Sequence, residues 1–411
     1  MAGFTVCGRA QGDEIVLGMS AAFTGPSRGL SIELYRGSMA YLEQVNESGG
    51  VHGRRVVIKA YDDGYNPVPA IRNTIRLVEE DNVFLLYGYM GSPTTVRILP
   101  LLKAYEARPM YLFFPFTGAE PQRRPPHDDF VFNLRTSYYQ ETVGLVEHLL
   151  QLGRRRIGVF YQLDAYGKSG WDGVRRTLEK HNLAMAGDAA YLRGSKYAAS
   201  FRPQVEILRS AGADVVISIA TYEASAGFIR DARDAGWDVP IANVSGVDGE
   251  NMLKLLAETG ALMAKDYTVN LINTQVVPSY HETNLEAVTE YRRQMDRFSK
   301  EPSRLLPARE LLDQDYVPPP YSFISFEGFL NAKVLVEALK RMRPEDIAGQ
   351  NRQAIRAAVE SMAELPIGID VPVSFGPRKH QGLPSGKVYY TVVRGGKFEP
   401  LGDADWGRWR Q

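Results

Sequence analysis

Side chains suited to holding a small molecule recur in loops that each follow a predicted strand. The loops combine hydroxyl, amide and aromatic groups, which bind ligands through hydrogen bonds and ring contacts. They span residues 20–30, 89–95, 114–120, 163–166, 221–222 and 243–248. Because open α/β sheets bind ligands at the carboxyl ends of their strands, we expect these loops to face one another across a cleft.

The residue groupings that mark many enzymes are missing from the sequence. The first predicted strand is not followed by Gly-x-Gly-x-x-Gly, and there is no Walker loop, no His-Glu-x-x-His and no Gly-x-Ser-x-Gly. The histidines are scattered and never paired at a metal-ligand spacing: His52, His127, His148, His181, His281 and His380. We therefore expect no catalysis, no metal and no cofactor. An enzyme built from distant loops is the least favoured of three interpretations.

Composition narrows the class of protein further. The 411 residues predict two or three domains of roughly 150 residues. Apolar residues make up 44% and charged residues 23%, as in ordinary globular proteins. Lys+Arg and Asp+Glu are both 48, so zero net charge argues against a nucleic-acid partner. Cys7 is the only cysteine, which excludes an internal disulfide, and no apolar run approaches the roughly 20 residues of a membrane helix.

Short apolar runs alternate with helical periodicity along the chain. Strands are predicted at residues 15–19, 56–58 and 83–86, and a second series has strands at 156–160 and 214–219 with helices at 168–181 and 223–235. This alternation predicts an α/β fold with two doubly wound, Rossmann-like lobes and parallel sheets. A long helix at 321–343 and a strand at 388–393 follow an irregular segment at 302–320. Residues 1–13 lack the apolar region of a signal peptide and are expected to be a tail, either a cloning remnant or the stub of a removed leader.

Seven stretches, in order and at the expected spacing, resemble the type I periplasmic substrate-binding proteins, the branched-chain amino-acid-binding group of ABC uptake systems. They are residues 17–26, 45–53, 61–67, 88–95, 115–118, 164–167 and 231–236. The resemblance implies a type I periplasmic binding protein fold, whose lobes are joined by three hinge crossings, expected near 133–134, 276–278 and 367–369. Lobe I would comprise residues 14–133 and 278–366, and lobe II residues 134–277 and 367–411.

The same resemblance implies a monomeric periplasmic protein that performs no chemistry. Its lobes would close on a small-molecule ligand and deliver it to an inner-membrane transporter or permease. It also implies ligand contacts: Ser92 would hold a carboxylate, Tyr166 and Tyr222 would cover the ligand, and Tyr321 would add an aromatic wall.

Several positions depart from the amino-acid-binding pattern. Ser245 stands where that group places an acidic residue for the ligand ammonium, and Asp248 or Glu250 would have to reach back to replace it. Thr117 follows Phe116 in a Phe-rich run, with Glu120 as a new polar anchor, and Leu30 replaces an aromatic residue. Leu30, Phe116 and Tyr321 would form apolar walls of the cleft, and Tyr316 and Val317 would add to them if residues 301–320 fold over it.

These departures favour a largely apolar ligand, lipid-like, sterol-like or aromatic. The chain also resembles, more distantly, the periplasmic sterol-binding component of bacterial sterol transport. The alternatives are branched-chain amino-acid or amide binding for ABC uptake, or a sensor subunit that reads such a ligand.

Overall fold

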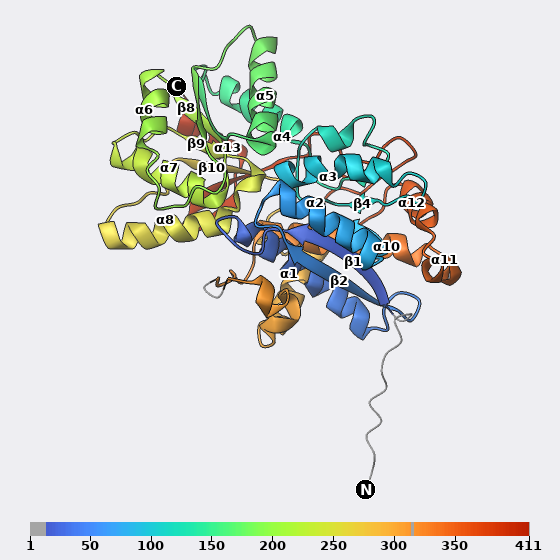
Figure 1. The fold of residues 1–411 in the computed structure, drawn as a ribbon. Helices are drawn as coiled ribbons and strands as arrows, with labels where there is room; N and C mark the ends of the chain where they lie inside the picture. The colour runs from blue at the N-terminus through green and yellow to red at the C-terminus, as the bar shows by residue number, and fades with distance from the viewer. Residues whose placement is uncertain (1–13, 314–315, 411) are drawn as a thin grey trace.

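Two parallel-stranded sheets, each flanked by helices, form the two lobes seen in Figure 1. The computed structural model describes residues 14–313 and 316–410. The predicted tail, residues 1–13, lies outside this described part. The alternating pattern of strands and helices confirms the predicted α/β fold.

The first sheet has five parallel strands in the order β2-β1-β3-β4-β5. Apolar residues meet across it, with Ile15 opposite Val56 and Leu17 opposite Leu85. The strands are β1 (Glu14–Ala21), β2 (Arg55–Asp62), β3 (Leu85–Tyr87), β4 (Leu112–Phe113) and β5 (Val131–Phe132). Its helices include α1 (Arg28–Glu47), α2 (Pro67–Ile75), α3 (Ser92–Ala104), α9 (Glu286–Phe298), α10 (Phe323–Lys340), α11 (Pro344–Ala348) and α12 (Arg352–Glu360).

The second sheet has seven strands in the order β12-β11-β10-β9-β8-β6-β7. Only β11 and β12 run antiparallel to their neighbours. The strands are β6 (Ile157–Gln162), β7 (Gly187–Tyr191), β8 (Val215–Ile219), β9 (Ile241–Asn243), β10 (Leu271–Gln275), β11 (Tyr389–Arg394) and β12 (Lys397–Pro400). The helices are α4 (Tyr138–Gln151), α5 (Ala165–Lys180), α6 (Arg202–Ser210), α7 (Tyr222–Asp234), α8 (Gly249–Met263) and α13 (Asp403–Trp406). Nowhere in residues 14–313 and 316–410 does a helix have the length and apolarity needed to span a bilayer.

The chain passes between the sheets in three places. The first passage follows β5, the second follows β10, and the third lies between α12 and β11. The first and third are paired, because Asn133 N–H donates to the His380 carbonyl (2.8 Å) and Gly382 N–H to the Asn133 carbonyl (2.8 Å). Phe375 packs against Phe114 and Phe132 beside the first sheet. We therefore propose that the third crossing lies at residues 380–388, later in the chain than the sequence suggested.

Helices α1 and α10 pack directly against each other in the first lobe, although they are far apart in sequence. Two glycines permit this approach. A Cβ added at Gly37 would overlap the backbone carbonyl of Ser325, and one at Gly328 would overlap the carbonyl of Leu34. The contact also holds a hydrogen bond from Ser38 Oγ to the Gly328 carbonyl (3.2 Å).

Replacing Gly37 by alanine should lower the free energy of unfolding by about 1–3 kcal/mol, because the added methyl group forces the two helices apart. Urea denaturation followed by circular dichroism measures the change. Gly407→Ala is the control, since a Cβ there meets no atom within 4 Å. Equal stability of the two variants would contradict the close packing of α1 on α10.

Candidate functional site

Two hydroxyl side chains of the first lobe meet at the carboxyl end of its sheet. Ser92 begins α3 and Thr117 follows β4, and their hydroxyl oxygens are 2.7 Å apart. Gly91 N–H donates to the Phe116 carbonyl (3.1 Å), which holds the two loops together. Thr117 Oγ1 also accepts from Ala119 N–H (3.1 Å), and both side chains are buried. The structure therefore brings together two of the predicted contacts, Ser92 and Thr117.

Aromatic rings of the second lobe lie against this hydroxyl pair. Tyr138 N–H donates to the Gly118 carbonyl (2.7 Å), which places α4 directly beside the Thr117 loop. The rings of Tyr138 and Tyr166 are 5.1 Å apart, and Tyr166 O–H donates to the Ala220 carbonyl (3.3 Å). Burial raises the pKa of both phenols, so they remain protonated donors at neutral pH. Tyr166 thus lies beside Tyr138 in this cluster, and its role in covering a ligand stays a prediction.

A buried guanidinium stands at the centre of this cluster. Arg135 follows β5 in the first crossing, and its side chain is only 1% exposed. The guanidinium lies 4.2 Å over the ring of Phe116 and donates through Nη2 to Ser245 Oγ. Its Nε is 3.6 Å from Glu327 of α10. Burial is the largest single influence and opposes the charge, but Glu327, Tyr138, Glu141 and Tyr166 together outweigh it and raise the pKa of Arg135. Sequence reasoning missed Arg135, although it follows a strand directly at a predicted crossing.

The acidic partner of Ser245 comes from α4. Glu141 accepts hydrogen bonds from Ser245 N–H (2.7 Å), Ser245 O–H (2.7 Å) and Thr274 O–H (2.8 Å). The sequence offered Asp248 and Glu250 as substitutes for the missing acid. Within the described residues, neither forms a hydrogen bond with Ser245. Glu141 was not identified from the sequence, where it is one polar residue in an amphipathic helix.

Asp248 and Glu250 instead face the first lobe at a second place. Asp248 accepts from Asn251 Nδ2 (2.7 Å), and Glu250 accepts from Phe323 N–H at the start of α10 (3.2 Å). Burial raises the pKa of Glu250 to about 7 and that of Asp248 well above its usual range, and neighbouring carboxylates add to both shifts. The lobes therefore meet here across carboxyl groups that bind protons readily.

Tyr222 belongs to this second contact, whereas Leu30 of α1 is a core residue. A Cβ added at Gly29 would lie 2.7 Å from both Asp248 Oδ2 and Asn251 Nδ2, and 3.3 Å from Tyr222 Cε1. The start of α1 thus packs closely against the second lobe. Leu30, the next residue, is buried in the core. Tyr222 and Leu30 therefore lie apart from Ser245 and Arg135, and no hydrogen bond or ring contact joins the two pairs in the described residues.

The remaining predicted contacts, Glu120 and Tyr321, lie elsewhere. Glu120 pairs with Arg124 (3.0 Å) on the wall of a cavity of about 990 Å³ beside the first crossing. Tyr321 hydrogen-bonds to Asp296, and Arg292 covers its ring at 4.7 Å.

A different aromatic residue of the irregular segment reaches the lobe contact. Tyr316 O–H donates to Glu33 (3.2 Å) and accepts from Asn251 Nδ2 of the second lobe (3.1 Å). Its neighbour Val317 is 65% exposed. The segment therefore adds a polar bridge, rather than the apolar wall that Tyr316 and Val317 would have formed.

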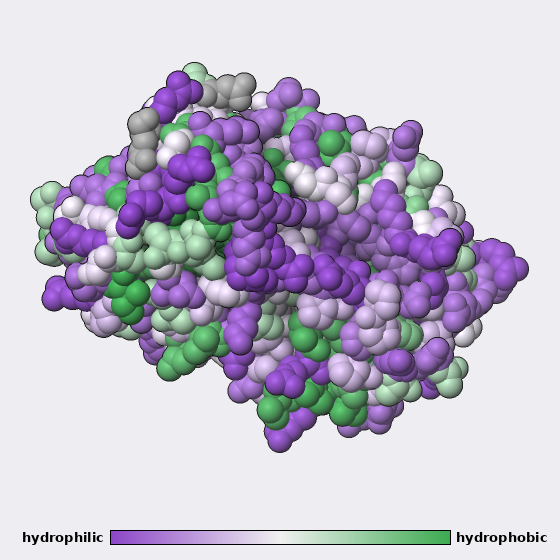
Figure 2. Space-filling view, turned by 90° about the horizontal axis from the view of Figure 1, so that it is seen from above, coloured by the Kyte–Doolittle hydropathy of each residue, from purple (hydrophilic) through white to green (hydrophobic). Residues whose placement is uncertain are grey.

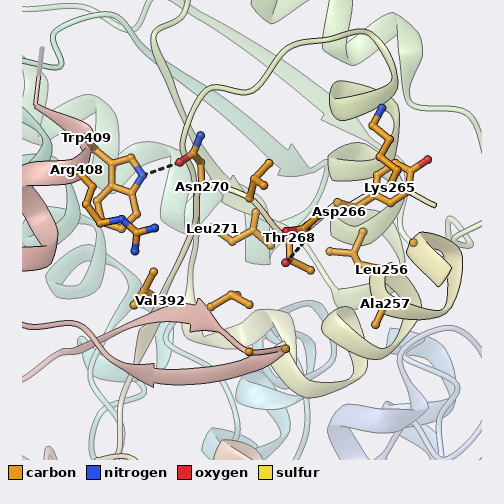
Figure 3. A pocket seen from close by; sticks show the side chains of 16 residues that line it. Leu256, Ala257, Lys265, Asp266, Thr268, Asn270, Leu271, Val392, Arg408 and Trp409 are labelled. Carbon is orange, nitrogen blue, oxygen red and sulfur yellow. Dashed lines mark hydrogen bonds between the residues drawn. The ribbon is translucent and has the colours of Figure 1, made fainter. Parts of the chain in front are cut away.

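Another hollow, of about 500 Å³, lies at the opposite end of the second sheet (Figure 3). Leu271 and Val392 line it, and Trp409 Nε1 donates to Asn270 Oδ1 (3.2 Å) at its edge. None of the predicted site residues lines this hollow. In the described part of the chain, no three His, Cys, Asp or Glu side chains are arranged to hold a metal ion.

The chain is similar to proteins of known family along most of its length. The sequence pattern of the periplasmic binding protein family matches residues 14–397. An "Amino acid binding protein" from Pseudomonas aeruginosa is 23% identical over 57% of this chain and 61% of its own length. A "Leu/Ile/Val-binding protein homolog 7" from Brucella abortus is 25% identical over 84% of this chain and 81% of its own length.

A solved structure agrees with this assignment. It is described as a possible leucine/isoleucine/valine-binding protein from Rhodopirellula baltica, and it is 27% identical with a TM-score of 0.81. The alignment covers 97% of this chain and 98% of that one. Such proteins bind small solutes outside the cytoplasm and hand them to transporters. The chain belongs to the periplasmic binding protein family, with the type I fold of its branched-chain amino-acid group.

Proposed function

We propose that this protein is a non-enzymatic solute-binding component of an ABC uptake system, and that its lobes close on a compact, amino-acid-like solute. The observation that carries the proposal is the charged centre of the cluster. Arg135 contacts Glu327 of the first lobe and Ser245 of the second, and its guanidinium lies over Phe116, next to Thr117. Glu141 accepts hydrogen bonds from the same Ser245. Such a centre suits a small solute with polar groups of its own.

The prediction of a large apolar ligand is not supported. Phe116, expected to form an apolar wall, has its ring face covered by the Arg135 guanidinium. Placing a lipid or sterol against buried ionic groups removes their hydration without replacing it, which is costly. The relatives named above are an amino acid binding protein and a Leu/Ile/Val-binding protein homolog, and these names favour the amino-acid or amide alternative.

Burial at the cluster supports a mechanism of opening and closing. Ser92, Thr117 and Tyr166 are each at most 2% exposed. A solute therefore reaches them only when the lobes separate. The outer surface offers no comparable apolar site on the face in Figure 2, where hydrophilic residues dominate and apolar ones form small scattered groups. We infer that the three crossings act as the hinge and that the ligand biases the closed state.

A thermal-shift panel tests the class of ligand. Amino acids, with their amides and deamino acids, are compared with fatty acids and sterols. We expect an amino-acid-sized solute to raise the melting temperature by several degrees, because a ligand at about 100 times its Kd adds about 2.7 kcal/mol. Stabilisation only by fatty acids or sterols would reject the proposal and restore the apolar interpretation.

Replacing Gly29 by valine should hold the lobes apart, because its side chain would collide with Asp248 and Asn251. Affinity for the stabilising solute should fall by about tenfold or more, since the closed state becomes less populated. Small-angle X-ray scattering should show that the solute no longer reduces the radius of gyration. Gly407→Ala serves as the control, and a Gly29→Val variant that closes like the wild type would refute this contact as part of closure.

A further inference from the structure

The guanidinium of Arg135 has unused hydrogen-bonding capacity inside the protein. Its Nη2 is bonded to Ser245, but Nε and Nη1 have no hydrogen-bond partner in the described residues. The side chain is 1% exposed, and its guanidinium lies 4.2 Å from the ring of Phe116 and 6.0 Å from that of Tyr138. Buried donors of this kind are rare in folded proteins, because leaving them unpaired is costly.

The carboxyl group beside it is ion-paired with Arg135 but accepts no hydrogen bond from the described residues. Glu327 lies on the first-lobe helix α10 with its side chain 5% exposed, and its one recorded partner is Arg135 Nε at 3.6 Å. That separation is too long for a hydrogen bond. No described residue donates a hydrogen bond to Glu327, whereas Glu141 accepts three. Glu327 is therefore a buried acceptor, next to buried donors, without a donor of its own.

These two side chains define what a ligand must present. Arg135 needs an acceptor oxygen and Glu327 needs an N–H donor, on neighbouring atoms of one molecule. A primary amide and the zwitterionic end of an α-amino acid both have this arrangement. A carboxylic acid without an amino group satisfies Arg135 but leaves Glu327 unpaired and adds a second negative charge near it.

We propose that Arg135 and Glu327 together recognise a neighbouring acceptor oxygen and N–H donor of the ligand, and that Glu327 is the acid that receives its ammonium or amide N–H. The inference rests on the proposed function and specifies its ligand. It assigns to α10 the task for which the sequence offered Asp248 or Glu250, in place of the acid missing at Ser245. Binding of an amino acid should depend on the negative charge of Glu327, whereas binding of an amide should depend on it much less.

Glu327→Gln tests the assignment by removing the charge while keeping an acceptor. Isothermal titration calorimetry is performed with L-leucine, 4-methylpentanamide and 4-methylpentanoate, which share one carbon skeleton. Wild-type protein should bind 4-methylpentanoate more weakly than at least one of the other two. The substitution should weaken leucine binding by about tenfold or more, since a bond to a charged group is lost, and should change amide binding much less.

Glu337→Gln is the matched control, because it makes the same substitution at a half-buried position of α10, where the carboxylate pairs with Lys340. It should leave all three affinities unchanged. Leucine binding that responds identically to both variants would overturn the inference and leave the proposed function intact. If no amino-acid-sized solute binds the wild-type protein, the proposed function fails and the inference fails with it.

The pH dependence of wild-type binding provides a test that does not require a variant to fold. Burial raises the pKa of Glu327 to about 7, although Arg135 opposes the shift. An ammonium at Glu327 favours the ionised carboxylate, so leucine affinity should rise from about pH 5 to about pH 7 and then level off. Binding near pH 6 should release a proton, measured by calorimetry in two buffers of different ionisation enthalpy.

Other charged or titratable groups facing Glu327 are Arg123, Arg135, Glu141 and Tyr87. Asp63 and Glu250 also have pKa values raised to about 7, and they lie in other contacts. Glu327→Gln removes only the proton of Glu327, so loss of proton release in this variant identifies its source. An amide should bind without proton release. Leucine binding that is independent of pH and releases no proton would contradict the assignment.

Discussion

A cation buried at a junction between two lobes must be neutralised from both sides. Arg135 stands at such a junction, because it lies in the first crossing and its guanidinium is enclosed by both lobes. Removing a charge from water costs several kcal/mol unless charged or polar partners replace the lost hydration. Glu327 contributes from the first lobe, and Ser245, supported by Glu141, contributes from the second. The charge of Arg135 is therefore neutralised only when the two lobes are close together and polar or charged groups fill the space between them.

Parallel sheets explain why the remaining parts of the site gather there. Each strand of the first sheet ends at the same edge, so Ser92 after β3 and Thr117 after β4 become neighbours despite their separation in sequence. The second sheet presents Tyr166 after β6 and Ser245 after β9 in the same way. Because the crossings join the lobes along one side, these edges face each other, and closure excludes water from the groups between them.

The elements that were predictable from sequence are those whose apolar pattern is long enough to show a period. The strands expected at 156–160 and 214–219 and the helices after them are confirmed by β6, β8, α5 and α7. Strands β4 and β5 have two residues each and no period to detect. Among the predicted contacts, Ser92, Phe116, Thr117, Tyr166 and Ser245 lie in one cluster, because loop positions follow from topology. Glu327 was missed because a charged residue usually marks a solvent-facing position, yet the largely apolar run Phe323 to Leu330 around it was a signal of burial.

The close approach of α1 and α10 has a consequence for how this chain matures. The glycine-lined face of α1 is complete once Glu47 has been synthesised, but its partner helix α10 is complete only at Lys340. Domains generally fold as units during synthesis, at roughly 5–20 residues per second. The core strands and helices of the second lobe, from α4 to β10, are therefore all synthesised before the first lobe can close its core. We expect the nascent first lobe to expose apolar surface for many seconds, which favours handling by a chaperone while the later segments emerge.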